Sequence, residues 1–383
     1  LRGLPIFTID SAETKDIDDA ISLMKTQNGG YELGVHIADV SHYVRPDTAL
    51  DKEAYERATS IYYADKVIPM LPTQLSNGIC SLNEGEERLA FSCLMQLDES
   101  GNIHSYQFVK SVIRSRVKGV YKEINALLDG SNDPALVTKY KDVMAQLPAM
   151  TELYEKRLAL RKARGAMDIE SDEAKLVMDE EGRCVDIVKR TRGVSECMIE
   201  EFMLLANQCA ANAGRTHHVP FVYRIHEAPD AERMEKLSNT LKACGLNVHF
   251  AGEVPTQLEL SAILDETRGQ PIQIPVHTGF ATHASEQSSR QEVSAVRIER
   301  DVEDLYKAEY MHNHLGEVYT GTVAGVTPRG IFVALENTVE GFVPAAQLCK
   351  GEATVVEGVS ILLDVGRPRQ SAGGRCQRCP WPH

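Results

Sequence analysis

Four aspartates lie close together near the start of the chain, in the segment "FTIDSAETKDIDDAISL". They are Asp10, Asp16, Asp18 and Asp19. Carboxylates this close repel one another, and a buried carboxylate without a partner either destabilises the fold or takes up a proton. A bound divalent cation, neighbouring Arg or Lys side chains, or water around an exposed loop could each compensate this charge. Hard oxygen donors without His or Cys favour Mg²⁺, with Mn²⁺ possible, over Zn²⁺.

The spacing of these aspartates does not match an EF-hand, because the required glycine and the distal glutamate are not in place. Magnesium held by a few carboxylates, with open positions for water and phosphate oxygens, is the usual arrangement for phosphodiester cleavage. The acidic segment therefore predicts metal-dependent phosphate chemistry. A solvent-exposed acidic loop is the alternative.

The elements that follow the acidic segment place it at the mouth of a β-sheet. Two apolar-rich segments, 20–26 and 31–37, flank Asn28-Gly29-Gly30, which is a strong signal for a hairpin turn. The proline-containing segment 67–83 predicts an ordered loop with short helical pieces. We therefore expect the aspartates to stand beside a folded sheet.

A further strand is predicted at 107–118, and it carries four cations at alternate positions. They are Lys110, Arg114, Arg116 and Lys118. Side chains two residues apart in a strand project from the same face. Such a cationic face suits phosphate contacts, and a solvated sheet face is the alternative.

Two helices are predicted after this strand. Residues 151–164 predict a charged helix, and residues 195–214 predict a largely apolar core helix that ends at Gly214. Within the second helix Glu200 and Glu201 are adjacent, so their side chains point about 100° apart. At least one of them is expected to face inward.

The second half of the chain begins with a predicted strand and helix at 221–245. Arg224, His226 and Glu227 stand where the two meet, which is a common place for functional side chains. A histidine satisfied within the core is the alternative there. Another long charged helix is predicted at 284–312.

Size and composition indicate an ordinary folded protein. The chain has 383 residues, 43% hydrophobic and 25% charged, and single cores stop growing at roughly 250–300 residues, so we expect two domains. No apolar run approaches the ~18 residues of a membrane span, and the first residues lack the features of a signal peptide. We expect a cytoplasmic protein without membrane association and, since it begins at Leu1, the inside of a longer chain.

Net charge and cysteine content argue against some functions and suggest the state of the thiols. A net charge of −14 argues against a protein that coats nucleic acid with its whole surface, but allows a basic groove on an acidic body. Nine scattered cysteines predict reduced, partly buried thiols. Cys376-x-x-Cys379 with His383 offers three zinc ligands and no fourth. We expect a disordered or foreign tail at 363–383, with a zinc site as the alternative.

Five segments together resemble the catalytic RNB domain of the ribonuclease II/ribonuclease R family, most closely its bacterial ribonuclease R branch. They are "FTIDSAETKDIDDA", "LGVHIADVSHYV", "VIPMLPTQLSNGICSLN", "IEEFMLLAN" and "YRIHEAP", in the family's order. The Gly- and Pro-broken strands after residue 316 resemble an S1 RNA-binding domain. The resemblance implies an α/β (α+β) RNB domain at 1–315 and a partial all-β S1/oligonucleotide-binding barrel at 316–362.

What the resemblance implies for function is Mg²⁺-dependent, processive 3′→5′ degradation of single-stranded RNA to nucleoside 5′-monophosphates, by a monomer. All four aspartates match acidic positions of the family, with metal binding chiefly at Asp10 and Asp19, and cleavage dependent on Asp18 and Asp16. Metal ions would offset the repulsion and stabilise the attacking and leaving oxygens of an in-line displacement.

The resemblance also implies a set of RNA contacts. Tyr62 matches an aromatic that stacks on a base near the 3′ end, a contact worth roughly 1–3 kcal/mol per base; an ordinary core aromatic is the alternative. Glu200 or Glu201 resembles the acidic residue that contacts the terminal ribose. Glu299 matches a glutamate close to the active centre and joins the catalytic candidates.

The remaining candidates for RNA binding lie elsewhere in the chain. Phe332 and Phe342 stand at barrel positions that can stack on RNA, and we expect one of them to be core. The other candidates are Arg114, Arg116 and Arg224.

One difference from the family bears directly on activity. The family's segment of the approximate form "HFTSPIRRYPDL", whose arginine lies at the scissile phosphate, has no counterpart here, and an internal stretch near 279–284 is missing. Such an arginine stabilises charge developing on the phosphate, often by orders of magnitude in rate. Arg290 and Arg297 are the substitutes that the sequence offers.

Other differences lie at the ends of the chain. The family's N-terminal cold-shock-type domains are absent, and the S1-like part stops near Ile361. Ile169 stands where many relatives carry an aromatic that clamps the last base. A catalytically impaired RNA-binding remnant of the same family is therefore the alternative function.

Overall fold

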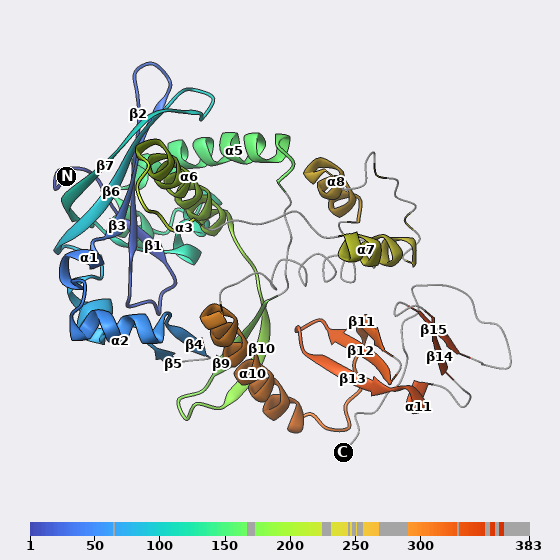
Figure 1. The fold of residues 1–383 in the computed structure, drawn as a ribbon. Helices are drawn as coiled ribbons and strands as arrows, with labels where there is room; N and C mark the ends of the chain where they lie inside the picture. The colour runs from blue at the N-terminus through green and yellow to red at the C-terminus, as the bar shows by residue number, and fades with distance from the viewer. Residues whose placement is uncertain are drawn as a thin grey trace. The chain divides into compact units, whose positions relative to one another are not determined.

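In the computed structural model, the chain folds into two compact units (Figure 1). The first comprises Leu1–Ser60, Pro69–Ala163 and Thr191–Ile225, and the second comprises Ile61–Ile68, Arg164–Arg190 and His226–His383. The residues that the structure describes are 1–63, 66–166, 173–223, 231–243, 246, 250, 256–267, 290–327, 329–348, 353–356 and 360–363. Within these ranges, no helix is long and apolar enough to cross a membrane.

A four-stranded antiparallel sheet forms the centre of the first unit. Its strands, in spatial order, are β2 (Asp19–Lys25), β3 (Tyr31–Ala38), β6 (Glu87–Leu97) and β7 (Ile103–Arg114). The predicted hairpin is confirmed, because β2 pairs with β3 and Gly29 takes a positive φ of 82° in the turn.

The strand predicted at 107–118 is wrong in its C-terminal part. β7 ends at Arg114, and a separate strand, β8 (Lys118–Val120), pairs in parallel with β1 (Thr8–Asp10). Between them the backbone N–H of Arg116 donates to the carbonyl of Ile6 at 2.7 Å, so the chain leaves the sheet at this point. The four cations therefore do not share one strand face.

Helices and short turns complete the first unit. They are α1 (Val40–Tyr43), α2 (Ala49–Arg57), a π-helical turn (Gln74–Ile79), α3 (Tyr121–Leu128), α4 (Pro134–Tyr140), a 3₁₀ turn (Met144–Gln146), α5 (Leu147–Ala163) and α6 (Val194–His217). The short helical turn confirms the ordered loop expected at 67–83.

The end predicted for the core helix at Gly214 is wrong. α6 continues to His217 and ends where His218 takes a left-handed conformation, with φ of 51°. Gly214 lies buried inside the helix, where a Cβ would come within 2.8 Å of the Tyr223 hydroxyl. Close packing, and not helix termination, is thus the reason for glycine at this position.

The main core lies between the sheet and α3, α5 and α6, which pack beside it (Figure 1). Leu33 and Val35 of β3 are buried there with Phe202 and Leu205 of α6. Apolar residues of α6 recur on one face, so burial of that face accounts for the long helix. A smaller cluster around Ile17 and Leu82 packs beneath the loop that carries the aspartates.

A row of polar side chains, buried except for the half-buried Ser111, crosses the sheet from β2 to β7. The His36 ring places Nε2 3.0 Å from the Ser22 hydroxyl and Nδ1 2.8 Å from the Ser92 hydroxyl. Ser92 in turn lies 2.7 Å from the Ser111 hydroxyl. Every strand contributes one member, so the row gives each buried polar group a partner.

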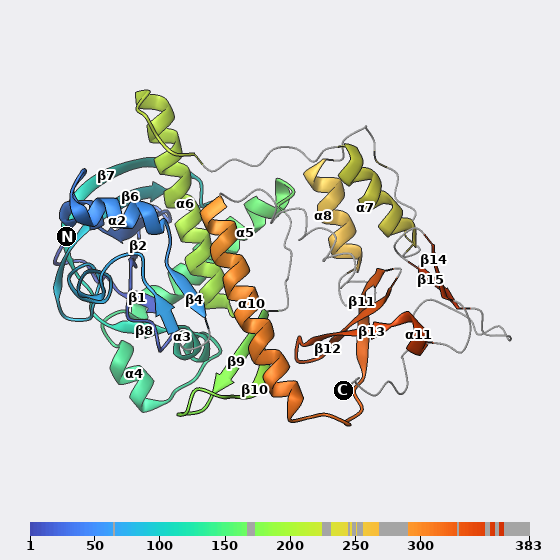
Figure 2. The same ribbon diagram turned by 60° about the horizontal axis from the view of Figure 1, so that its bottom comes forward.

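In its described residues, the second unit consists of helices and small antiparallel sheets (Figure 2). Its elements are β4 (Ile61–Tyr63), β5 (Lys66–Ile68), β9 (Glu173–Met178), β10 (Cys184–Arg190), α7 (Ala231–Ala243), α8 (Gln257–Thr267), α10 (Arg290–His312), β11 (Gly321–Thr327), β12 (Gly330–Leu335), β13 (Glu340–Pro344), α11 (Ala345–Leu348), β14 (Ala353–Val356) and β15 (Ser360–Leu363). α10 packs against β4 and β10, as both views show.

The structure tests two expectations for the second half of the chain. The strands expected after residue 316 are confirmed, with β11, β12 and β13 forming one antiparallel sheet. The strand expected from 221 is wrong in its described part, because residues 221–223 have no regular structure. The predicted domain boundary at 315/316 stays a prediction and falls inside the second unit.

Candidate active site

The loop that carries the aspartates is held at both ends by strands. Asp10 ends β1 and Asp19 begins β2, and Phe7 and Ile21 exchange backbone hydrogen bonds of 3.0 and 2.8 Å beside them. The Asp18 carbonyl accepts a bond of 2.9 Å from the Ala38 N–H. Both termini of the loop are therefore fixed to the sheet.

The middle of the loop is held by side chains from distant parts of the chain. The Lys118 ammonium donates to the carbonyls of Ala12 and Thr14 at 3.0 and 2.6 Å. The Ser81 hydroxyl accepts from the Ile17 N–H at 3.1 Å and donates to the Lys15 carbonyl at 2.8 Å. The acidic segment is thus an ordered part of the fold.

The carboxylates of this loop perturb one another. Burial raises the pKa of Asp19 to about 7, and the negative charges of Asp18 and Asp10 add to the effect. The pKa of Asp18 is also raised, first by loss of water around it and then by the charges of Asp10 and Asp16, against a lowering backbone hydrogen bond. Asp10 accepts bonds from its own loop, from the Ser11 N–H at 2.7 Å and the Thr14 hydroxyl at 2.9 Å.

One oxygen of this group has no partner. Asp19 Oδ2 is buried and makes no hydrogen bond. Among the described Lys and Arg side chains, none forms an ion pair with Asp10, Asp18 or Asp19, so within the described part of the chain no cationic side chain compensates their charge. A buried carboxylate oxygen among other carboxylates fits a hard divalent cation by its donor chemistry.

The side chains as arranged do not form a closed metal site. Across the described part of the chain, no group of three or more His, Cys, Asp or Glu side chains is close enough together to hold a metal ion. The donor types fit Mg²⁺, whereas full coordination would need further ligands such as water or phosphate oxygens, which Mg²⁺ commonly keeps.

Tyr62 lies in β4 with 51% of its surface exposed, so the alternative of a core aromatic is wrong. Its backbone N–H donates to Glu299 Oε1 of α10 at 3.0 Å. These two candidates, far apart in the sequence, are therefore brought together. β4 pairs only with β5 among the described strands, so the tyrosine stands on a small two-stranded hairpin.

The two adjacent glutamates of α6 separate as predicted. Glu201 is 2% exposed, and its carboxylate lies 3.5 Å from the Nε atoms of both Arg157 and Arg161 of α5. Glu200 faces solvent, where it pairs with Arg192 and lies 3.7 Å from Arg161 Nη1. Contact of either carboxylate with a ribose stays a prediction, and Glu200 is the more accessible of the two.

The described Lys and Arg side chains that the sequence suggests for phosphate contacts form ion pairs or hydrogen bonds with groups of the first unit. Arg114 Nη2 lies 3.6 Å from Glu87 Oε1, and the Arg116 guanidinium donates to the Arg2 carbonyl at 3.2 Å. Lys110 pairs with the buried Asp39 at 3.2 Å. Arg224, together with His226, Glu227, Ile169, Cys376 and Cys379, lies outside the described residues.

Phe332 and Phe342 face each other across β12 and β13. They are direct cross-strand partners, with ring centroids 5.1 Å apart. The expectation that one of them is core is wrong, because each is 37% exposed. Directly opposed residues of an antiparallel pair share one face of the sheet, so the two rings form one aromatic surface.

Sequence reasoning missed the residues that support the site. The sequence places Lys118 on a cationic strand face, whereas in the structure it holds the acidic loop. The arginines around Glu201 carry no local sequence signal, because they lie about 40 residues from Glu201 in the chain.

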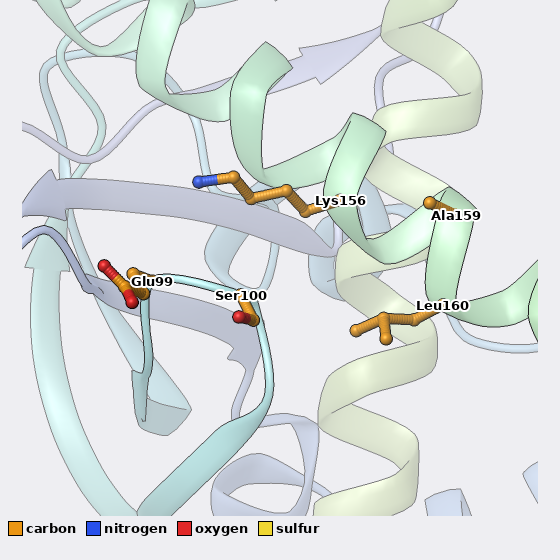
Figure 3. A pocket seen from close by; sticks show the side chains of 5 residues that line it. All are labelled: Glu99, Ser100, Lys156, Ala159 and Leu160. Atoms are coloured by element: carbon orange, nitrogen blue, oxygen red, sulfur yellow. The ribbon is translucent and has the colours of Figure 1, made fainter.

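A surface pocket lies between the β6–β7 turn and α5 (Figure 3). It is lined by Glu99, Ser100, Lys156, Ala159 and Leu160, and none of them is a candidate site residue.

Comparison with known families decides the lineage. The RNB domain matches residues 1–297, and the S1 RNA binding domain matches residues 314–360. The chain belongs to the RNB domain family. Ribonuclease R 1 of Lactococcus lactis is 37% identical to this RNB chain over 433 positions, which cover 94% of the chain and 53% of the relative. Ribonuclease R of Thermotoga maritima is 36% identical over 414 positions, covering 91% and 58%.

Solved structures agree on the fold. Mycoplasma genitalium RNase R in complex with ribose methylated single-stranded RNA superposes with a TM-score of 0.83 at 22% identity, covering 98% of this RNB chain and 68% of that one.

Two facts about length follow from these alignments. The RNB chain spans little more than half the length of the curated relatives it matches. Both alignments also extend over more positions than the 383 residues of the chain. The relatives therefore carry residues within the matched region that this chain lacks, and the place of the shortening near 279–284 stays a prediction.

Proposed function

We propose that this RNB protein is a 3′→5′ exoribonuclease that degrades single-stranded RNA to nucleoside 5′-monophosphates with Mg²⁺ or Mn²⁺. The observation that carries the proposal is the buried, unpartnered Asp19 oxygen within a loop of mutually repelling carboxylates. The relatives named ribonuclease R, and the similar structure that holds single-stranded RNA, support the substrate class.

Asp10, Asp16, Asp18 and Asp19 are the residues that would hold the metal. When bound, the ion supplies charge that offsets the carboxylates and polarises the phosphate oxygens. The loop contributes order, since Lys118 and Ser81 hold its backbone at several points. The backbone of the site is thus ordered before binding, and the adjustment needed to hold the ion would fall to the carboxylate side chains.

Exposed aromatic rings supply RNA contacts that do not depend on base sequence. Tyr62 in one hairpin, and the pair Phe332 and Phe342 in the S1 sheet, are partly exposed. Every base has a face that can stack on such rings, so these residues suit an enzyme that degrades RNA of any sequence. We further propose that the protein works as a cytoplasmic monomer, which size-exclusion chromatography with light scattering tests.

A catalytically impaired RNA-binding protein is the second candidate. The relatives carry internal residues that this chain lacks, and the phosphate-facing arginine of the family is expected among them. Arg297 is exposed and lies 3.9 Å from Asp301 on its own helix, while the side chain of Arg290 lies outside the described part. Retained RNA binding without cleavage is the behaviour this candidate requires.

The deciding experiment uses single-stranded RNA labelled in every nucleotide, with an accessible 3′ end, and Mg²⁺. We expect stepwise shortening with release of mononucleotides, and loss of product by at least about 100-fold in Asp18→Asn, because a charged ligand is lost. RNA binding without product in the wild type would support the second candidate instead.

A metal titration separates metal binding from activity. We expect Mg²⁺ to raise the melting temperature of the wild type, since a ligand that binds only the folded state stabilises it. Asp19→Asn should reduce this rise, because the unpartnered oxygen is removed. An identical rise in both proteins would contradict the assignment of Asp19.

A further inference from the structure

The hydrogen bond between Glu299 and the backbone of Tyr62 is the contact that suggests a distinct role for Glu299. The carboxylate accepts from the main-chain N–H of Tyr62 at 3.0 Å. α10, which carries Glu299, packs directly on β4, which carries Tyr62. The glutamate therefore holds the backbone of β4 at the position of Tyr62.

The hairpin that bears Tyr62 has little support of its own. β4 and β5 form a two-stranded sheet of three residues each, and isolated two-stranded hairpins are marginally stable in water. Tyr62 and its cross-strand partner Val67 are 51% and 47% exposed. Both side chains are about half exposed, and the contact from α10 at Glu299 fixes the backbone of the strand at Tyr62.

The chemistry of the contact suits this task. A carboxylate that accepts a backbone N–H makes a charge-assisted hydrogen bond, which is stronger and more directional than a neutral one. The N–H groups of an edge strand that have no partner strand are otherwise left to water. Glu299 thus gives the outer edge of β4 a specific partner at the position of the exposed aromatic.

We propose that Glu299 is a positioning residue: it fixes the backbone of Tyr62 so that the tyrosine ring is held ready to stack on a base of single-stranded RNA. This inference rests on the proposed function for its ligand. It differs from the role expected from the sequence, because Glu299 acts through Tyr62 and not on the reacting phosphate.

The test is a double-mutant cycle read out as RNA affinity. Single-stranded RNA with a free 3′ end is titrated with the full chain in the presence of a chelator, so that no cleavage intervenes. The variants are Tyr62→Ala, Glu299→Ala, Glu299→Gln and the double change of Tyr62 and Glu299 to Ala. Glu303→Ala is the matched control, because Glu303 lies one turn further along α10 and pairs with Lys307 at 2.7 Å.

The expected pattern is specific to positioning. Tyr62→Ala weakens binding by about five- to 100-fold, as loss of one stacked base implies, and Glu299→Ala weakens it several-fold. The double variant is no weaker than Tyr62→Ala, because the glutamate has nothing left to position. Glu299→Gln retains most of the affinity, since its amide oxygen can still accept the N–H, and Glu303→Ala binds like the wild type.

Hydrogen exchange gives a readout that needs no RNA. The backbone amides of 61–63 should exchange faster in Glu299→Ala than in the wild type or in Glu299→Gln. Equal exchange in all three proteins, or independent and multiplicative effects of the two alanine changes on affinity, would overturn the positioning role. Absence of RNA binding by the wild type would instead overturn the proposed function, and with it the stacking on which this inference rests.

Discussion

Asp19 and His36 lie on neighbouring strands, β2 and β3, and burial acts on them in opposite directions. It raises the pKa of Asp19 to about 7 and lowers the pKa of His36 to about 4, because in both cases it disfavours the charged form. The His36 ring has two serine hydroxyl partners, whereas Asp19 Oδ2 has none. His36 is therefore a structural residue, and Asp19 is the one suited to take an external ligand.

The burial of His36 predicts how stability depends on pH. Between about pH 6.5 and 4 the unfolded chain binds a proton at this histidine and the folded chain does not, so the free energy of unfolding falls as the pH is lowered through this window. The loss amounts to about 3 kcal/mol at most. Urea unfolding at pH 4 to 7, with His36→Gln as the matched variant, isolates the effect; parallel pH curves for the two proteins would contradict it.

At the scale of elements, α5 and α6 are joined by charged side chains as well as by the apolar core. Glu201 of α6 lies between two arginines of α5, and the Arg157 guanidinium also donates to the Gly101 carbonyl at 3.1 Å. This cluster connects two helices and the β6–β7 turn. Glu200, one residue earlier, makes its ion pairs at the surface.

The adjacent glutamates should therefore differ strongly in their effect on stability. Glu201→Gln leaves two guanidinium groups without their buried counter-charge, and we expect it to lower the free energy of unfolding by about 3–5 kcal/mol. Glu200→Gln removes exposed ion pairs and should cost about 1 kcal/mol or less. Chemical denaturation of both variants measures the difference. Similar losses would show that the buried pairs do not connect the helices.

At the scale of the whole molecule, the chain combines the acidic loop of the RNB domain in one unit with an S1 sheet in the other. Its net charge of −14 does not favour RNA over the whole surface. The aromatic surface of the S1 sheet offers attraction that does not depend on net charge, because stacking is largely apolar. We therefore expect several separate aromatic contacts, each stacking on a base, to contribute to the affinity for RNA.

This sharing predicts the behaviour of the S1 aromatics. Phe332→Ala and Phe342→Ala should each weaken binding of single-stranded RNA by about fivefold or more. Their effects should be less than additive, since the rings contact each other. Titration of a fluorescent RNA by each single variant and the double variant measures this. Val323→Ala, an exposed aliphatic change in the same sheet, is the control.

The sequence alone determined the acidic loop, the β2–β3 hairpin and the family. These features are carried by neighbouring residues: four aspartates within ten positions, a turn with two glycines, and continuous motifs in a fixed order. Local chemistry specifies such features, because it needs no knowledge of what packs against them. The inward direction of one of the two adjacent glutamates followed in the same way from helix periodicity.

Only the tertiary structure decided which long-range partners these residues find. It showed that Glu201 is the buried glutamate, that Lys118 holds the acidic loop, and that Glu299 reaches the backbone of Tyr62 from 237 positions away. It also ended β7 at Arg114 and left both S1 phenylalanines exposed. Each of these outcomes depends on contacts between segments distant in the sequence, and the spacing of residues along one segment does not contain that information.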